Sequence, residues 1–172
     1  MIATGQTGLI QGARYGIALD AIPSQFCSGE LEATIVEACE NENPDVIIIE
    51  GQGALSHPAF SSSAFILRGS CPHGVILQHA PSRLNRCDFN AMKMPTPIDE
   101  INLIQTFSDT KVIGMAINHE NMNDMELTKV INQYEQQLVM PVTDPLSDTK
   151  QRLIEMVFIA FPDLRDISLV AA

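Results

Sequence analysis

The apolar run Val-Ile-Ile-Ile at 46–49 constrains the fold of this 172-residue chain more than any other feature. β-Branched residues favour strands, and an unbroken apolar run indicates a strand that is covered on both faces. Comparable runs occur at 74–79 (Gly-Val-Ile-Leu-Gln-His) and at 111–118 (Lys-Val-Ile-Gly-Met-Ala-Ile-Asn). Strands of this kind belong to parallel sheets with helices on both faces.

Segments with helical spacing lie between these runs. In 28–39, for example, the apolar residues Leu31 and Ile35 recur at the spacing of a helix, while glutamates occupy the other face. The pattern predicts short extended pieces at 1–4 and 17–22, helices at 28–39, 61–67, 97–107, 124–138 and 147–161, and a surface loop at 92–100.

The alternation of strands and helices implies right-handed crossovers. It predicts a three-layer α/β/α fold with a mainly parallel sheet. With 45% hydrophobic residues, the chain is long enough for one core, so we expect a single domain over 1–172.

The charge of the chain argues against several classes of partner. The formal net charge is -11 and the ten Lys and Arg residues are scattered, so neither nucleic acid nor an anionic membrane is an expected partner. The apolar runs are far shorter than the about 20 residues that span a bilayer. The four cysteines form no C-x-x-C pair. Together these features predict a cytoplasmic protein with reduced thiols.

Polar residues and glycines follow the predicted strands, where parallel sheets bind their ligands. The segment that follows the run at 46–49 is the richest, with Glu50, two glycines and Ser-His-Pro. A carboxylate at a strand end can hold Mg²⁺ or act as a general base, so Glu50 and His57 are the predicted catalytic residues. The predicted ligand-binding residues are Thr4, Gly5, Gln6, Thr7, Gly51, Gln52, Gly53, Ser56, His79, Arg83 and Asn118.

Structural roles compete with each of these assignments. Glycine-rich loops also serve simply to reverse the chain, and the alternative role for His57 before Pro58 is to hydrogen-bond its own loop. Asp20 is either a helix N-terminal acid or a second metal-binding carboxylate beside Glu50.

Several familiar motifs are missing from the sequence. It contains no G-x-S-x-G and no Gly-Lys-Ser or Gly-Lys-Thr, so neither a nucleophile elbow nor a Walker A loop occurs within the 172 residues. One further set contains the residue types of a zinc site, but its spacing matches no familiar finger or ribbon: Cys71, His73, His79 and Cys87.

The stretches ATGQTG (3–8), YGIALDAI (15–22) and EGQGALSHPAF (50–60) carry a family resemblance. In this order they resemble the C-terminal domain of a bacterial and archaeal family long known as a domain of unknown function. Some members of that family are described as D-glutamate N-acetyltransferase-like. The resemblance covers nearly the whole chain, through KVIGMAIN (111–118) to VTDPLSD (142–148). More distantly, the chain is similar to dethiobiotin synthetase.

The resemblance implies a P-loop NTPase-like fold that is truncated at its N-terminus. Family members carry an N-terminal Rossmann-like domain and a P-loop strand before the position of Met1, and neither occurs in the 172 residues. We therefore expect the chain to correspond to the later part of a family member.

The resemblance also implies roles for individual residues. Glu50 would match the acid that helps to hold Mg²⁺, with Asp20 as a second carboxylate. Thr4, Gly5 and Gln6 would line the substrate side, and Asn118 would lie where the relatives meet a purine base. If the acetyl transfer of the family applies, acetyl-CoA is the donor, D-glutamate is the acceptor, and Glu50 or His57 is the base. The arginines nearest the predicted site would offset the charge of the anionic ligand: Arg14, Arg68 and Arg83.

Three functional hypotheses follow. The first is a domain that binds a small anionic molecule, with N-acyltransferase activity implied by the resemblance alone. The second is a catalytically inactive module for ligand binding or oligomerisation, and the third is a Mg²⁺-nucleotide-binding domain completed by a missing segment. A hydrolase that activates water with His57 and Glu50 has no independent support. Exposed sheet edges are usually covered, so a homo-oligomer is expected in each case.

Overall fold

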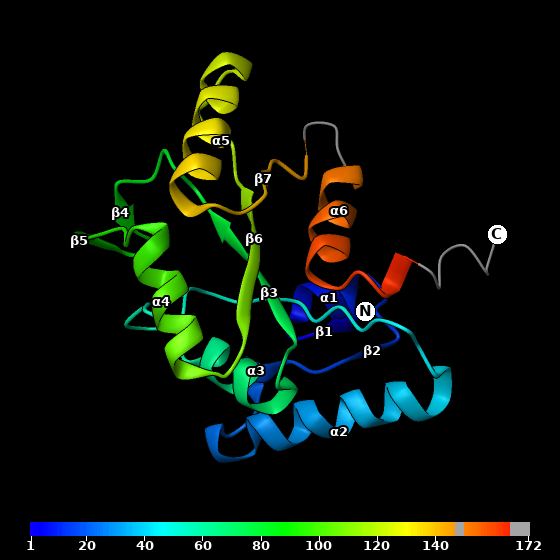
Figure 1. Cartoon of the computed structure of the whole chain (residues 1–172). Helices are drawn as coiled ribbons and strands as arrows, with labels where there is room; N and C mark the ends of the chain where they lie inside the picture. The colour runs from blue at the N-terminus through cyan, green and yellow to red at the C-terminus, as the bar shows by residue number, and fades with distance from the viewer. Residues whose placement is uncertain (147–149, 166–172) are drawn as a thin grey trace. The chain divides into compact units, whose positions relative to one another are not determined.

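The computed structural model describes residues 1–146 and 150–165, in which helices and strands alternate along the chain (Figure 1). The chain forms two compact units. The first comprises Met1–Pro72 and Phe107–Asp109, and the second comprises His73–Thr106 and Thr110–Ala172. The expectation of a single domain over 1–172 stays a prediction.

The strands of the first unit meet at Ile2. Strand β1 (Ile2–Ala3) pairs in parallel with β2 (Tyr15–Gly16). Ile2 also forms a parallel bridge with Ile49, through hydrogen bonds from Ile2 N to Ile48 O (2.8 Å) and from Glu50 N to Ile2 O (2.9 Å). Successive residues of a strand direct their backbone groups to opposite edges, so β1 lies between β2 and the segment 46–50.

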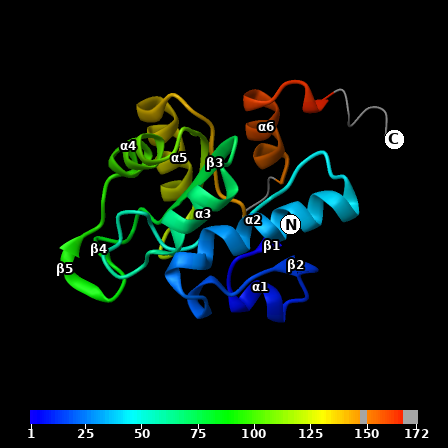
Figure 2. The ribbon, with the colours of Figure 1, turned by 90° about the horizontal axis from the view of Figure 1, so that it is seen from below.

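Helices cover these strands with apolar side chains. The helices of the first unit are α1 (Gln6–Ile10), the 3₁₀ helix η1 (Leu19–Ala21), α2 (Ser24–Glu42) and α3 (Ser62–Ser70). Helix α2 lies along β1 and β2 (Figure 2). Its buried Leu31 packs in one core with Ile2 and Ile66. A Cβ at Gly69 would lie 2.5 Å from Ser28 O, so the absence of a side chain there lets α3 approach α2.

A parallel sheet forms the centre of the second unit. Its strand order is β3 (Gly74–His79), β6 (Lys111–Ile117), β7 (Val142–Thr143). The remaining elements are an antiparallel hairpin and three helices: β4 (Asn85–Arg86), β5 (Phe89–Lys93), α4 (Pro97–Phe107), α5 (Asp124–Leu138) and α6 (Lys150–Ala160).

The central strand β6 has a helix on each face. Met115 and Ile117 are buried in one core with Leu127 of α5. Gly114 has the opposite orientation, because a Cβ there would lie 2.6 Å from the sulfur of Met156 in α6. Helices α5 and α6 therefore lie on opposite faces of the sheet, which gives this unit three layers (Figure 1).

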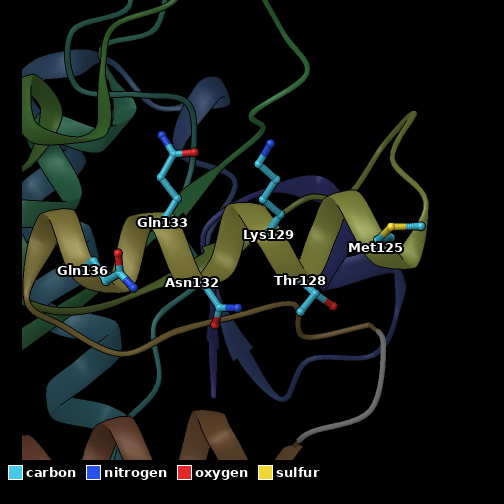
Figure 3. Close-up of a pocket in the computed structure, with 6 residues that line it drawn as sticks. All are labelled: Met125, Thr128, Lys129, Asn132, Gln133 and Gln136. Atoms are coloured by element: carbon cyan, nitrogen blue, oxygen red, sulfur yellow. The ribbon is translucent and has the colours of Figure 1, made fainter.

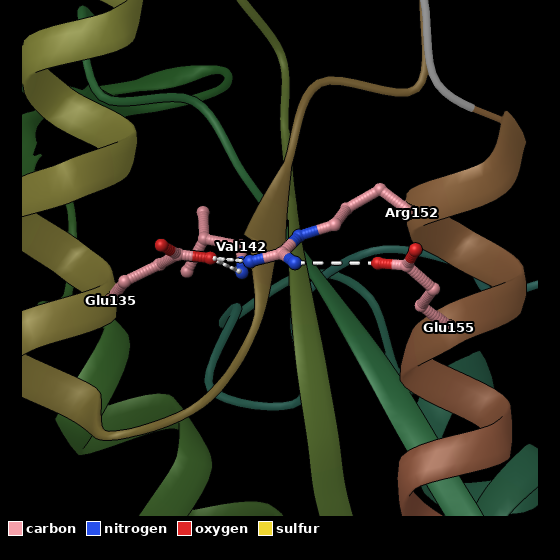
Figure 4. Close-up of polar contacts among 4 residues, drawn as sticks. All are labelled: Glu135, Val142, Arg152 and Glu155. Carbon is pink, nitrogen blue, oxygen red and sulfur yellow. Dashed lines mark hydrogen bonds and ion pairs between the residues drawn. The ribbon is translucent and has the colours of Figure 1, made fainter.

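Ion pairs connect α5 and α6 beside the edge strand β7 (Figure 4). Arg152 of α6 donates a hydrogen bond to Glu135 of α5 and another to Glu155 at 3.3 Å. The same Glu135 oxygen accepts from Val142 N at 3.1 Å. The Glu135 carboxylate of α5 thus links this helix to α6 and to β7.

The structure confirms the predicted α/β class and most of the predicted elements. Helices 97–107 and 124–138 have the predicted bounds, and β3 and β6 coincide with the predicted strands to within one residue. Helix α5 begins at a capping box, in which Asn123 accepts from Glu126 N and Glu126 accepts from Asn123 N. Residues 147–149 of the helix predicted at 147–161 lie outside the described residues.

The prediction for 46–49 is wrong in one respect. The segment runs parallel to β1, but it is not covered on both faces, since 49% of Val46 and 65% of Ile48 are exposed. Only the alternate residues, Ile47 and Ile49, pack against the core of the first unit. An unbroken apolar run thus does not identify a strand with two covered faces here.

Two further predictions are corrected. The piece at 17–22 is not extended throughout, because residues 19–21 form the 3₁₀ helix η1. The segment 92–100 is not a surface loop, because β5 continues to Lys93 and α4 begins at Pro97, a residue well suited to a first helical turn. The β4–β5 hairpin was missed, since its strands lack clear alternation. Among the described residues, no helix combines the length and apolarity needed to span a membrane.

We predict that Gly114→Ala destabilises the chain by about 1–3 kcal/mol, because the new methyl group would overlap Met156 across the β6–α6 contact. Urea unfolding of the variant and of the wild type measures this. The control is Gly29→Ala in α2, where nothing lies within 4 Å of the added Cβ. That change should stabilise the chain by about 0.5–1 kcal/mol. Equal effects of the two substitutions would contradict the packing described for β6.

Candidate functional site

Three of the predicted residues meet at the end of β1 and form what we call the Thr4 cluster: Thr4, Glu50 and Gln52. Thr4 N donates to Glu50 Oε2 at 2.9 Å, and Thr4 Oγ1 donates to Glu50 O at 3.1 Å. Gln52 Nε2 donates to Thr4 Oγ1 at 3.0 Å. Thr4 is fully buried, whereas Glu50 and Gln52 are half-buried. The cluster therefore holds a partly accessible carboxylate in one orientation.

Glycines allow this close packing. A Cβ at Gly8 would lie 2.6 Å from Ala3 Cβ and 2.9 Å from Glu50 Oε2, and one at Gly5 would lie 2.8 Å from Gln52 Nε2. These two glycines are thus needed by the cluster itself. Between them, Gln6 and Thr7 are exposed in the first turn of α1.

The glycines after Glu50 lie in a different environment. A Cβ at Gly53 would lie 2.7 Å from the ring of Phe60, and the carbonyl of Gly53 accepts from Ser63 Oγ. Gly51 is exposed and has open space around it. Gly53 therefore makes room for an aromatic ring of its own loop, and Ser56 in the same loop is half-buried.

His57 is engaged in the structure of its loop. Its ring stacks on Phe60 at a centroid distance of 4.2 Å, and its Nδ1 accepts from Ala59 N at 3.3 Å. The side chain is buried. This geometry matches the structural alternative for His57, and its role as a base stays a prediction.

Asp20 and Glu50 are the two carboxylates predicted for a metal ion. Asp20 is exposed in η1, and Glu50 Oε2 is occupied by the backbone N–H of Thr4. Within residues 1–146 and 150–165, no group of three or more His, Cys, Asp and Glu side chains is placed to hold a metal ion. Mg²⁺ is usually held by only one or two protein carboxylates, with water or a bound phosphate in its other positions. The Asp20–Glu50 pair stays a prediction.

The other predicted residues belong to the second unit, at the carboxyl ends of β3 and β6. Asn118 N donates to His79 O at 2.8 Å, and Asn118 Oδ1 accepts from Glu120 N at 3.1 Å. Arg83 donates twice to Glu120, each time at 2.6 Å. His79, Arg83, Asn118 and Glu120 thus form one connected group of the second unit.

The arginines suggested for the anionic ligand all have partners: Glu42 for Arg14, the ring of Phe107 for Arg68, and Glu120 for Arg83. The pairing with Glu120 holds the pKa of Arg83 above its usual value, mainly through the hydrogen bond. Through Glu120, Arg83 is connected to Asn118, another predicted residue of its unit.

His79 is partly buried against Tyr134. Its Nε2 is 3.3 Å from Tyr134 Oη, and the two rings meet edge to face at 5.7 Å. Burial lowers the pKa of His79, because the charged imidazolium is poorly solvated there. The residue is therefore suited to be neutral at the pH of the cell.

Sequence reasoning missed Asp144, a buried acid at this edge. Asp144 follows β7, its side chain is fully buried, and its Oδ2 lies 2.5 Å from His119 Nδ1. The sequence places His119 at a strand end but indicates no partner for it. The signal for Asp144 is Val-Thr-Asp, two β-branched residues and then an acid, which repeats in shorter form the pattern that ends at Glu50.

A hollow of about 640 Å³ lies over α5 (Figure 3). It is lined by exposed residues of this helix alone, from Met125 to Gln136, and by none of the predicted site residues. We therefore do not assign it to the site.

The chain is similar to a known protein family and to a solved structure of one member. A family model described as the P-loop domain of a domain of unknown function, DUF1611, matches residues 1–154. A crystal structure of a DUF1611 family protein from Anabaena variabilis is 27% identical, with a TM-score of 0.85, over 92% of this chain and 47% of that one.

Two curated relatives are named D-glutamate N-acetyltransferase. The protein from a Pseudoalteromonas species is 33% identical over 153 residues, covering 85% of this chain and 45% of the relative. The protein from Tritonibacter scottomollicae is 29% identical over 161 residues, covering 89% of this chain and 46% of the relative. The chain thus spans less than half the length of the relatives that it matches.

We predict that Thr4→Val destabilises the chain by about 1–3 kcal/mol, because it removes the buried hydroxyl that donates to Glu50 O and accepts from Gln52. Thr4→Ser keeps the hydroxyl and is the matched control, with a smaller loss. Chemical denaturation of both variants measures the difference. If valine were tolerated as well as serine, the hydroxyl would not hold the cluster together.

We predict that the chain loses stability as the pH falls below about 6.5, partly through His79. The folded state resists protonation of this buried ring, whereas the unfolded state accepts a proton near its ordinary pKa. The stability contribution is therefore present above the unfolded pKa and is lost as the pH falls through the folded one. Thermal melts of wild type and His79→Gln between about pH 7.5 and about pH 5 measure it.

The variant should lose less stability over this interval. His73→Gln, a change of an exposed histidine, should keep the wild-type dependence. An unchanged pH dependence in His79→Gln would contradict the assignment to His79.

Proposed function

Because this chain belongs to the DUF1611 family, we propose that it forms the P-loop-like part of an enzyme that transfers an acetyl group to the amine of D-glutamate or a similar acidic amino acid. The relatives named for this reaction supply the substrate class. The fold alone does not imply this activity, since P-loop-like folds host many functions.

The observation that carries the proposal is the geometry of Glu50. Its carboxylate lies at the carboxyl end of the segment paired with β1, is oriented by Thr4 N, and remains partly accessible. Ligands of parallel α/β sheets bind at this end of the strands. The residue lies within the part of the chain that the family model matches.

Glu50 would serve the reaction by accepting a proton. The ammonium group of the amino acid must lose a proton before its nitrogen can attack. In the proposed step that proton passes to a Glu50 oxygen, and the amine attacks the thioester carbonyl of acetyl-CoA. An N–C bond forms, the C–S bond breaks, and the CoA thiolate leaves with the bonding electrons. The nitrogen loses its second proton to water, and the thiolate takes one up.

We predict that Glu50→Gln lowers kcat for acetyl transfer by about 10²–10⁴-fold, the range expected for loss of a general base. The amide keeps the shape and can still accept from Thr4 N, so folding should be retained. Asp45→Asn is the matched control, because Asp45 is an exposed acid at the other end of the same segment. Release of the CoA thiol, with acetyl-CoA and D-glutamate as substrates, measures the rate. Equal rates for wild type and Glu50→Gln would remove Glu50 from the reaction.

Ligand binding by the chain itself is tested by thermal shift. Acetyl-CoA, D-glutamate and N-acetyl-D-glutamate should each raise the melting temperature, because a ligand of the native state stabilises it by mass action. ATP with Mg²⁺ and inorganic phosphate are included to test the nucleotide alternative. A flat response from a chain that melts cooperatively would contradict the proposal, and a rise with ATP and Mg²⁺ alone would favour the alternative.

A further inference from the structure

The pair His119 and Asp144 has the geometry of a proton-transfer site. Asp144 follows β7, His119 lies two residues beyond the end of β6, and these parallel strands are neighbours in the sheet. The Asp144 side chain is fully buried, whereas 40% of the His119 side chain is exposed. A buried carboxylate thus orients an imidazole that a ligand can reach.

The hydrogen bonds determine which ring nitrogen carries the proton in neutral His119. Asp144 Oδ1 accepts from Leu146 N at 3.0 Å, and Oδ2 lies 2.5 Å from His119 Nδ1. An ionised carboxylate can only accept hydrogen bonds, so Nδ1 must be the donor. The lone pair of the ring then resides on Nε2. Histidines that act as bases are prepared in this way.

We propose that His119 accepts a proton, through Nε2, from the ammonium or hydroxyl group of a small anionic ligand bound at the carboxyl end of this sheet. Asp144 is the positioning residue: it fixes the tautomer and stabilises the imidazolium that forms. The transferred proton leaves the nitrogen or oxygen of the ligand, its bonding electrons stay on that atom as a nucleophilic lone pair, and Nε2 later releases the proton to water.

Two neighbouring side chains can donate hydrogen bonds to an anionic ligand. Glu120 follows His119 in the chain, and Arg83 donates to both of its carboxylate oxygens, which places a guanidinium beside this loop. Asn118 precedes His119 and accepts from Glu120 N with its oxygen, so its amide N–H groups are not used in that bond. Guanidinium and amide donors are the usual partners of carboxylate and phosphate groups.

All residues of this site belong to the second unit, whereas the Thr4 cluster belongs to the first. The inference therefore goes beyond the proposed function and does not require it. A structural role for Asp144 alone would need only its bond to Leu146 N, and would leave the tautomer and the reactivity of His119 unspecified.

The first test is the tautomer of His119, measured by ¹⁵N NMR of the imidazole nitrogens in the whole chain. Free neutral histidine prefers the proton on Nε2, so an Nδ1–H form of His119 would reveal the influence of Asp144. Asp144→Asn should reverse it, because the amide nitrogen donates to Nδ1 while its oxygen still accepts from Leu146 N. An Nε2–H form in the wild type would overturn the proposal.

The second test is reactivity with p-nitrophenyl acetate, an ester that an accessible imidazole lone pair attacks. Nε2 forms a bond to the carbonyl carbon, p-nitrophenolate leaves, and water hydrolyses the acetylimidazole. His119→Gln and Asp144→Asn should each lower nitrophenolate release at least about tenfold, a modest share of what a positioned base contributes. His73→Gln, a change of an exposed histidine at the start of β3, is the matched control and should leave the rate unchanged.

If His119→Gln releases nitrophenolate as fast as the wild type does, the proposal is overturned. Thermal melts of each variant exclude unfolding as the cause of a loss, and His119→Gln, at a half-exposed position, covers the case in which Asp144→Asn does not fold. A chain that is inactive with acetyl-CoA and D-glutamate but hydrolyses the ester through His119 would refute the proposed function and support this inference. A chain that transfers acetyl groups to D-glutamate but does not hydrolyse the ester through His119 would support the proposed function and refute this inference.

Discussion

The parallel hydrogen bonds between Ile2 and the segment 46–50 determine where Glu50 lies. Ile2 N donates to Ile48 O and Glu50 N donates to Ile2 O, and this register places the Glu50 side chain next to the N–H of Thr4. A slip by one residue would turn every side chain of the segment to the opposite face. The packing at Gly8, where any side chain would meet Glu50, depends on the same register.

The elements that the sequence predicted correctly are those whose determinants are local. Helix α5 has an amphipathic repeat and a capping box at Asn123, and helix α4 begins at Pro97, so neither requires information from distant residues. The strands β3 and β6 are also marked by their own apolar runs. The segment 46–49 is different, because exposure of Val46 and Ile48 depends on which elements cover it, and no local pattern records that.

In the candidate sites too, the residues predicted correctly are those with a local sequence pattern. The carboxyl end of a strand can be located from sequence, so Thr4, Glu50 and Gln52 were predicted and do meet. Partnerships across the sheet cannot be located in this way. His119 and Asp144 are joined only because β7, two residues long, pairs with β6, and a strand of that length leaves almost no pattern in the sequence. Asp144 was missed for this reason.

Glu50 and Asp144 show how one local pattern gives two different carboxylates. Each follows β-branched residues at a strand end, and each accepts a hydrogen bond from a backbone N–H, of Thr4 and of Leu146. Glu50 remains partly exposed, so its carboxylate can itself meet a ligand. Asp144 is fully buried and can act on a ligand only through the half-exposed ring of His119. Because a buried carboxylate needs partners to offset its desolvation, the pairing with His119 contributes to folding whatever chemistry it supports. For that reason the tautomer and reactivity of His119, rather than stability, are the properties that distinguish a proton acceptor from a structural contact.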